Sequence, residues 1–159
     1  MKKLFIASLI LGFIFLLQTE TKAQNYKNAI GVRLGAYNGL NFKTFLNNKA
    51  ALDLNLSFRG NSGYNRFLFT GLYEVHNQIN NAAGLKWYYG GGGSIGSYRY
   101  KNSELADYVH LSLDGVLGLD YKFNGAPINL ALDWRPRLLV TPDTDIYTGD
   151  VGLAIRFTF

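Results

Sequence analysis

The chain contains no cysteine among its 159 residues, only three prolines and a modest share of charged side chains. Without cysteine it has neither a disulfide nor a thiolate metal site. After Leu17 no segment approaches the ~20 consecutive apolar residues that cross a bilayer as a helix, which excludes a bundle of membrane-spanning helices. The charges are scattered and the net charge is only +5, so nothing points to nucleic acid as a partner.

The amino terminus has the organisation of a secretory signal peptide. Two lysines precede an apolar run from Leu4 to Leu17, and Thr21-Lys22-Ala23 offers a small-residue cleavage site. The run is short for a transmembrane helix, which needs ~20 residues. We therefore expect residues 1–23 to be removed and residues 24–159 to form one domain.

The rest of the chain alternates between apolar and polar residues with the period of two that a half-buried β-strand requires. The last segment shows this most clearly, because small or polar residues separate the apolar Val151, Leu153, Ile155, Phe157 and Phe159. Glycine is frequent, and eleven Tyr, eleven Phe and two Trp are present, which is typical of many strands joined by tight turns. The sequence therefore predicts an all-β fold.

Eight strands can be assigned from this alternation. Asn38-Gly39 and Asn124-Gly125 are strong hairpin signals between them, and a long loop is expected at 93–107. An even number of antiparallel strands fits a closed barrel, in which every backbone group is paired. The predicted strands cover approximately residues 29–35, 40–46, 52–59, 66–76, 83–92, 108–123, 128–135 and 151–159.

Alternation alone does not say which face of such a barrel is inside, since a soluble carrier of the lipocalin type encloses its ligand with an inward apolar face. Here the apolar face of every predicted strand lacks a charged residue, whereas the polar face holds acids and bases in near-equal number. A closed polar interior requires this, because a buried charge needs a partner. We therefore predict a closed eight-stranded antiparallel transmembrane β-barrel. Its lumen is expected to hold a charge network of Arg33, Lys43, Asp53, Glu74, Lys86, Asp114, Asp120, Asp133, Arg135 and Arg156.

Loop lengths orient the barrel, because outer-membrane barrels have short periplasmic turns and longer extracellular loops. The longest loop, 93–107, is then extracellular, and it is the candidate contact site for an extracellular ligand or protein. Aromatic residues near the same strand ends are expected to form an interfacial girdle. These residues are Tyr37, Phe58, Phe67, Tyr89 and Tyr147.

Several stretches resemble the small outer-membrane β-barrel proteins of Gram-negative bacteria, in particular the group described as outer membrane protein beta-barrel domain. They are Gly31–Gly35, Gly39–Lys43, Gly84–Gly90, Gly118–Phe123, Pro127–Pro136 and Arg156–Phe159. The resemblance implies a location in the outer membrane and contact with its lipid. It also implies that the barrel insertion machinery reads the terminal strand, with Phe159 as the main signal and Phe157 and Tyr147 as weaker contributors.

His110-Leu111-Ser112 is the strongest catalytic candidate, because a histidine base beside a serine nucleophile is a workable hydrolytic pair. Lipid A deacylases, which are also eight-stranded barrels, carry a similar His-x-Ser, but the asparagine expected after the serine is Leu113 here. The predicted alternation also turns both side chains into the lumen, away from a lipid substrate. We therefore expect a structural or interaction role without catalysis. A lipid-modifying hydrolase using His110 and Ser112 and a soluble lipocalin-like carrier are the alternatives.

No metal site is expected, because the two histidines, His76 and His110, are far apart in sequence and no cysteine accompanies them. Nothing in the sequence indicates a cofactor. The lumen charges could line an ion path or pack as a salt-bridge plug. An eight-stranded barrel is just wide enough for its side chains to fill, which favours the plug.

Overall fold

The computed structural model describes residues 26–60, 64–100 and 108–159, so the predicted signal peptide, residues 1–23, lies outside the described residues. No helix in this part of the chain is long and apolar enough to cross a membrane. The chain there forms strands and connecting turns. The strands are β1 (Asn28–Gly35), β2 (Gly39–Phe45), β3 (Ala50–Gly60), β4 (Tyr64–Gln78), β5 (Leu85–Tyr100), β6 (Tyr108–Lys122), β7 (Ile128–Trp134), β8 (Arg137–Thr141), β9 (Asp145–Tyr147) and β10 (Val151–Thr158).

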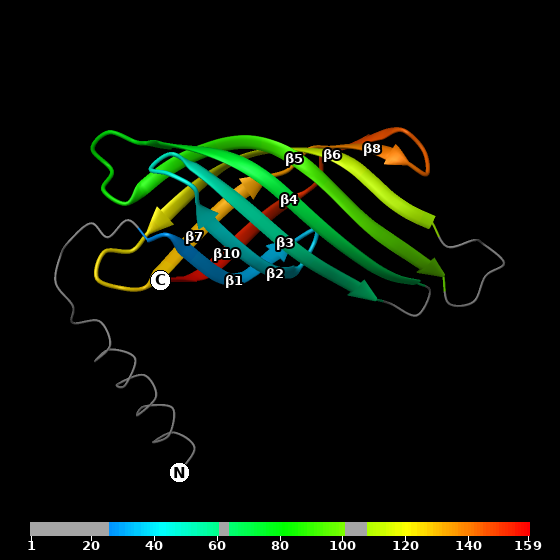
Figure 1. Cartoon of the computed structure of the whole chain (residues 1–159), viewed down its shortest axis with the longest axis horizontal. Helices are drawn as coiled ribbons and strands as arrows, with labels where there is room; N and C mark the ends of the chain where they lie inside the picture. Colours follow the sequence, from blue (N-terminus) through cyan, green and yellow to red (C-terminus); the bar gives the residue numbers. More distant parts are fainter. Residues whose placement is uncertain (1–25, 61–63, 101–107) are drawn as a thin grey trace, which may run out of the picture.

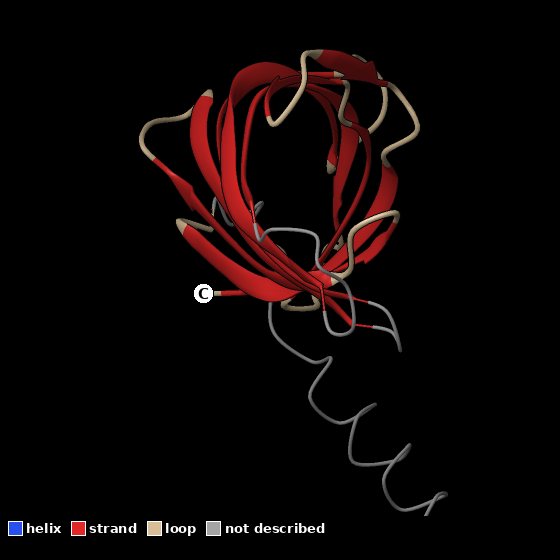
Figure 2. Cartoon of the chain, turned by 90° about the vertical axis from the view of Figure 1, so that its right-hand side faces the viewer, coloured by secondary structure: helices blue, strands red, loops and turns tan. Residues whose placement is uncertain are grey.

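The strands close into a barrel (Figures 1 and 2). Each strand from β1 to β6 pairs antiparallel with the next, and β10 completes the ring by pairing with both β1 and β7. The short β8 continues the line of β7 along β6, and β9 pairs with β8. The wall is therefore a closed eight-stranded antiparallel β-barrel, as predicted.

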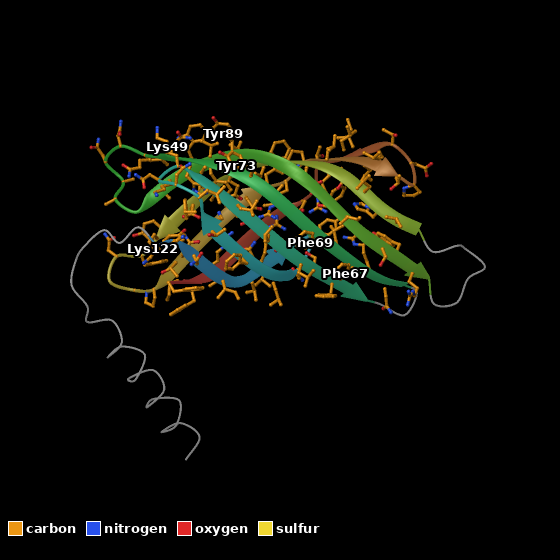
Figure 3. All side chains as sticks on the ribbon, viewed as in Figure 1. Lys49, Phe67, Phe69, Tyr73, Tyr89 and Lys122 are labelled. Atoms are coloured by element: carbon orange, nitrogen blue, oxygen red, sulfur yellow. The ribbon has the colours of Figure 1, made fainter. Side chains whose placement is uncertain are left out.

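The pairing register sorts the side chains onto two faces. Ile30 lies opposite Phe157 and Leu132 opposite Leu153, and all four are on the outer surface, at least 40% exposed. Figure 3 labels further residues of this apolar surface, including Phe67 and Tyr89. The intervening residues are buried inside the barrel and are mostly polar or charged. The soluble-carrier alternative is therefore wrong, because its apolar face would have to line the interior.

β5 is longer than predicted, because the chain stays in the sheet to Tyr100 instead of leaving it at Gly93. The run Gly90–Gly93 does not end the strand. Gly91 pairs with Tyr73 of β4 and with Gly115 of β6. A glycine keeps its backbone donor and acceptor, so a ladder flanked by two strands continues without side chains. Of the predicted 93–107 loop, residues 101–107 lie outside the described residues.

The seventh predicted strand is interrupted and then resumes. Pro136 has no N–H to donate and separates β7 from β8, but its carbonyl still accepts from the backbone N–H of Gly115 at 2.8 Å. The predicted loop at 141–145 shortens accordingly, since β8 reaches Thr141 and β9 begins at Asp145.

The strands differ in length around the wall. β4, β5 and β6 have 15 or 16 residues, whereas β1, β2, β7 and β10 have 7 or 8. We call the end of the barrel that holds Asn28 and Phe159 the terminal end, and the opposite end the far end. The β4–β6 side therefore extends well beyond the short β1–β2 turn at the far end (Figure 1).

Candidate functional site

The lumen holds one connected set of ionic side chains, which we call the lumen network. Each member is at most 4% exposed, and the members come from nearly every side of the wall. They are Arg33, Lys43, Asp53, Glu74, Asp114, Asp120, Asp133, Arg135, Arg137, Asp150 and Arg156.

The lumen network begins towards the far end at Asp114 of β6. Arg137 lies beside it, with Nε 3.7 Å from Asp114 Oδ2, and donates from Nη2 to Asp150 Oδ2 at 2.8 Å. Asp150 also accepts a hydrogen bond from Arg33 Nη1 at 3.0 Å. One carboxylate thus joins the arginines of two different strands.

Arginines and aspartates alternate through the middle of the lumen. Asp133 accepts from Arg33 Nη2 at 2.6 Å and from Arg135 Nη2 at 2.9 Å. Arg135 also donates to Asp53 at 3.3 Å, and Asp53 accepts from Arg156 at 3.0 Å. The guanidinium group suits this position, because its planar fork of donors can bond two carboxylates at once.

The lumen network ends towards the terminal end around Lys43 of β2. Its Nζ lies 2.7 Å from Glu74 Oε2, 3.5 Å from Asp120 Oδ2 and 3.7 Å from Asp53 Oδ2. His76 Nε2 lies 3.0 Å from the same oxygen of Glu74. Acids and bases therefore alternate without a break from Asp114 to Glu74, and each buried charge has a partner of opposite sign.

Two asparagines that the sequence analysis did not single out complete the middle of the lumen. Asn41 donates to Asp53 at 2.8 Å, and Asn129 donates to Asp120 at 2.7 Å. Both amide oxygens accept from Arg156, which therefore uses its whole guanidinium group inside the barrel. Such bonds are needed because a buried polar atom without a partner is costly.

Tyr88 of β5 fills the lumen beside the lumen network. Its ring stacks on the ring of His76 at 4.8 Å, and Lys43 Nζ lies 4.4 Å from its centroid. Its hydroxyl donates to Asp133 Oδ2 at 3.1 Å. The side chain is fully buried and links β5 to the ion pairs of the other strands.

Lys86 does not join the lumen network, contrary to the expectation. It is the second residue of β5, at the terminal end, and its side chain is only half-buried. Its Nζ lies 5.4 Å from the Phe45 ring, and no described carboxylate forms an ion pair with it. Arg137 is a member that the prediction omitted, because the predicted strand stopped at Arg135. Arg137 lies two residues after Arg135, so the same period of two places both on the inner face, and this spacing could have predicted its position.

His110 and Ser112 both face the lumen, but they do not form a catalytic pair. The Ser112 hydroxyl donates to Asp114 Oδ1 at 2.7 Å. Ser94 donates to the other oxygen of Asp114, and no described residue is hydrogen-bonded to His110 Nε2. The serine is thus bonded to a carboxylate and not to the histidine that the predicted pair requires.

The two histidines lie near opposite ends of the lumen, since His76 is near the terminal end of β4 and His110 near the far end of β6. Across the described ranges, no group of three or more His, Cys, Asp or Glu side chains is arranged to hold a metal ion.

The three residues predicted to form the insertion signal lie at two different ends. Phe157 and Phe159 are 55% and 60% exposed at the terminal end, where Phe159 and Asn28 exchange two backbone hydrogen bonds. Tyr147 lies instead on β9 at the far end, with its ring edge-on to Tyr37 at 6.1 Å. Tyr37 is not part of an outer girdle, because only 9% of it is exposed and its ring turns into the far-end opening.

Comparison with solved structures relates this barrel to two bacterial proteins. The N-terminal β-barrel domain of Pseudomonas aeruginosa OprF has a TM-score of 0.69 at 17% identity, over 86% of this chain and 100% of that one. Neisserial surface protein A (NspA) has a TM-score of 0.53 at 12% identity, over 83% of this chain and 93% of that one. The fold is that of the small outer-membrane β-barrels. No family model matches the sequence, and no curated protein does.

This fold and the exposed apolar surface agree with each other. A barrel whose outward side chains are apolar and whose charges are buried in the lumen is stable in hydrocarbon, where every backbone group must be paired within the sheet. The chain is thus built as a membrane-spanning barrel, which was the central prediction from its sequence.

Proposed function

We propose that the protein is a small integral protein of the Gram-negative outer membrane with a closed lumen and a structural or interaction role at its outer face. The lumen network is the observation that supports this proposal. It crosses the interior from β6 to β4 through contacts of 2.6–3.7 Å, and its members are buried. An eight-stranded barrel has room for little more than its side chains, so this interior leaves no wide path for solutes.

The far end is the outer end in this proposal. Long β4, β5 and β6 exceed the roughly 9–11 residues that a strand needs to cross a bilayer, and the excess lies at the far end. The outer strand ends and the adjoining 93–107 segment are then the surface that meets an extracellular ligand or protein. The partners at the membrane itself are outer-membrane lipid and the barrel insertion machinery.

Planar-bilayer recording tests the closed lumen. The purified full chain should give no stable single-channel conductance, whereas an open-pore protein inserted under the same conditions serves as the positive control. A reproducible unitary conductance for the wild type would overturn the closed lumen.

The absence of cysteine allows a clean test of location and orientation. Thr144→Cys places a thiol in the exposed far-end turn, and Asn124→Cys places one in an exposed terminal-end turn. A membrane-impermeant maleimide should label the first variant on intact cells and the second only after the cells are opened. The reverse pattern contradicts the orientation, and recovery of the protein in the soluble periplasmic fraction contradicts the membrane location.

A further inference from the structure

An aromatic ring lies at the far-end opening of the lumen. Tyr37 lies in the β1–β2 turn, which Asn38 holds by accepting from the backbone N–H of Gly35 at 2.7 Å and of Phe58 at 3.3 Å. The ring points inward. Burial raises the pKa of its hydroxyl, so Tyr37 is neutral at physiological pH.

Two guanidinium groups contact this one ring. Arg66 Cζ lies 3.9 Å from the centroid of Tyr37, and Arg137 Cζ lies 4.1 Å from it. Arg66 also lies 5.1 Å from the ring of Tyr98, whose hydroxyl accepts its hydrogen bond. Cation–π contacts therefore hold two like charges close together at the opening.

The described acidic residues do not fully neutralise the positive charge at this opening. Arg137 pairs with Asp114 and Asp150, but Asp150 is shared with Arg33. Arg66 has no carboxylate within ion-pair distance among the described residues. Among the described residues, its guanidinium group contacts only aromatic rings and a hydroxyl.

The same opening contains buried nitrogen atoms to which no described residue is hydrogen-bonded. Arg137 Nη1 and His110 Nε2 have no hydrogen-bond partner among the described residues, although their residues are 1% and 5% exposed. His110 lies next to Tyr98, with ring centroids 6.4 Å apart, and Arg137 contacts Tyr37, so these nitrogens lie beside the same pair of aromatic rings. Buried polar nitrogens of this kind normally have a hydrogen-bond partner.

We propose that this far-end opening binds a phosphate group through Arg66, Arg137 and His110, with Tyr37 and Tyr98 as its walls. A phosphate monoester presents three strong acceptor oxygens and a double negative charge, which matches two guanidinium groups and an imidazole better than a carboxylate does. This site would give the outer face of the proposed function a ligand. It rests on the proposed function in one respect, which is that the far end is the outer end. The phosphate could be free, carried by a soluble ligand or carried by a lipid headgroup.

Calorimetric titration of inorganic phosphate into the full chain, in dodecyl maltoside micelles, tests the site. The wild type should bind saturably, and Arg66→Gln should raise the Kd about tenfold or more, as expected for the loss of a charge-assisted hydrogen bond. Lys49→Gln, which removes an exposed cation at the terminal end, is the matched control and should leave the Kd unchanged. Arg66→Lys keeps the charge but not the fork, so its Kd should lie between the two. Heat-modifiable gel migration verifies that each variant is folded.

A second arm identifies the source of the phosphate. The same micelles are doped with phosphatidic acid or with phosphatidylcholine, and retained lipid is measured by native mass spectrometry. Retention of phosphatidic acid by the wild type but not by Arg66→Gln, without a response to inorganic phosphate, assigns the group to a lipid headgroup. Saturable binding of inorganic phosphate assigns it to a free or soluble ligand.

The site is refuted if the wild type binds neither probe, or if Arg66→Gln binds both as the wild type does. These outcomes differ from a failure of the proposed function. A barrel that conducts ions yet binds phosphate would refute the closed lumen and leave this site in place. A barrel that neither conducts ions nor binds phosphate would refute this site and leave the closed lumen in place.

Discussion

The ring of Tyr88 occupies the space above Gly118. A Cβ atom at position 118 would lie 2.6 Å from Tyr88 Cζ and 2.8 Å from the backbone oxygen of Leu132. Gly118 therefore makes room on β6 for an aromatic side chain that starts on β5. Gly152 has the same relationship to Arg33, whose Cζ would lie 2.3 Å from a Cβ there. Glycine at these inward positions allows long side chains to lie across the lumen.

Gly118→Ala is expected to lower the free energy of unfolding by about 1–3 kcal/mol, since overpacking forces neighbours off their preferred positions. The backbone oxygen of Leu132 cannot move aside as a side chain can. Gly91→Ala is the matched control. Gly91 faces lipid, and its new Cβ would come no closer than 3.4 Å to any neighbour. Urea titration of both variants in micelles measures the difference, and equal stabilities would show that the ring does not depend on Gly118.

Tyr88→Ala should make the lumen conduct ions. The variant removes a ring that contacts His76 and Lys43 inside the lumen, and water would fill the space that the ring leaves. Tyr89→Ala is the control, because Tyr89 is 47% exposed on the outer surface. Planar-bilayer recording should detect unitary currents in the first variant only. If Tyr88→Ala is as silent as the wild type, the ion pairs alone close the barrel.

Much of this architecture could be predicted from alternation alone. Leu153 and Ile155 face lipid and Arg156 faces the lumen, as the period of two requires. The pattern was informative because hydrocarbon excludes charge from one face and a closed lumen requires it on the other. Strand ends were harder to predict. Gly93 looks like a strand breaker, but the strands on both sides keep it in the sheet. Pro136 does interrupt its strand, yet its carbonyl still accepts a hydrogen bond from β6 and pairing with β6 resumes at Arg137.

The partners within the lumen could not be predicted in the same way. Alternation places Arg33 and Asp133 on the inner face, but their contact joins β1 to β7 across the interior and depends on the register of several strands. The inward position of Tyr37 at the far-end opening was missed because it lies outside a strand. Tyr37 belongs to a turn, where the period of two does not apply, so its inward direction leaves no trace in the sequence.

Arg33→Leu should lower the free energy of unfolding by about 3–5 kcal/mol, because it leaves two buried carboxylates with one fewer partner. Arg33→Lys should recover little of this loss. An ammonium group cannot reproduce bonds that run to Asp133 and Asp150 from different guanidinium nitrogens. Lys49→Ala, at an exposed turn, should change stability by less than about 0.5 kcal/mol. A stability of Arg33→Leu close to that of the wild type would mean that water or another residue replaces the arginine.

Ser112→Ala is expected to leave the lipid A of intact cells unchanged. Its hydroxyl bonds Asp114, and both residues face the lumen instead of the lipid. Mass spectrometry of lipid A from cells that express the wild type, the variant or neither protein measures the effect. A loss of acyl chains that requires Ser112 would revive the hydrolase alternative.

Phe159 should control how efficiently the barrel is assembled, and not how stable it is once assembled. Its ring is 60% exposed to the surroundings at the terminal end, so it contributes little packing within the folded protein. Its backbone exchanges two hydrogen bonds with Asn28 that any residue could make. Phe159→Ala is therefore expected to reduce the heat-modifiable, membrane-inserted fraction in cells, while the protein refolded in micelles keeps a free energy of unfolding within about 0.5 kcal/mol of the wild type.

Tyr147→Ala tests whether Tyr147 contributes to the insertion signal, because Tyr147 lies against Tyr37 at the opposite end of the barrel from Phe159. If Tyr147 also belongs to the signal, its variant should reduce insertion in cells as Phe159→Ala does. If only Phe159→Ala does so, the signal is confined to the last strand.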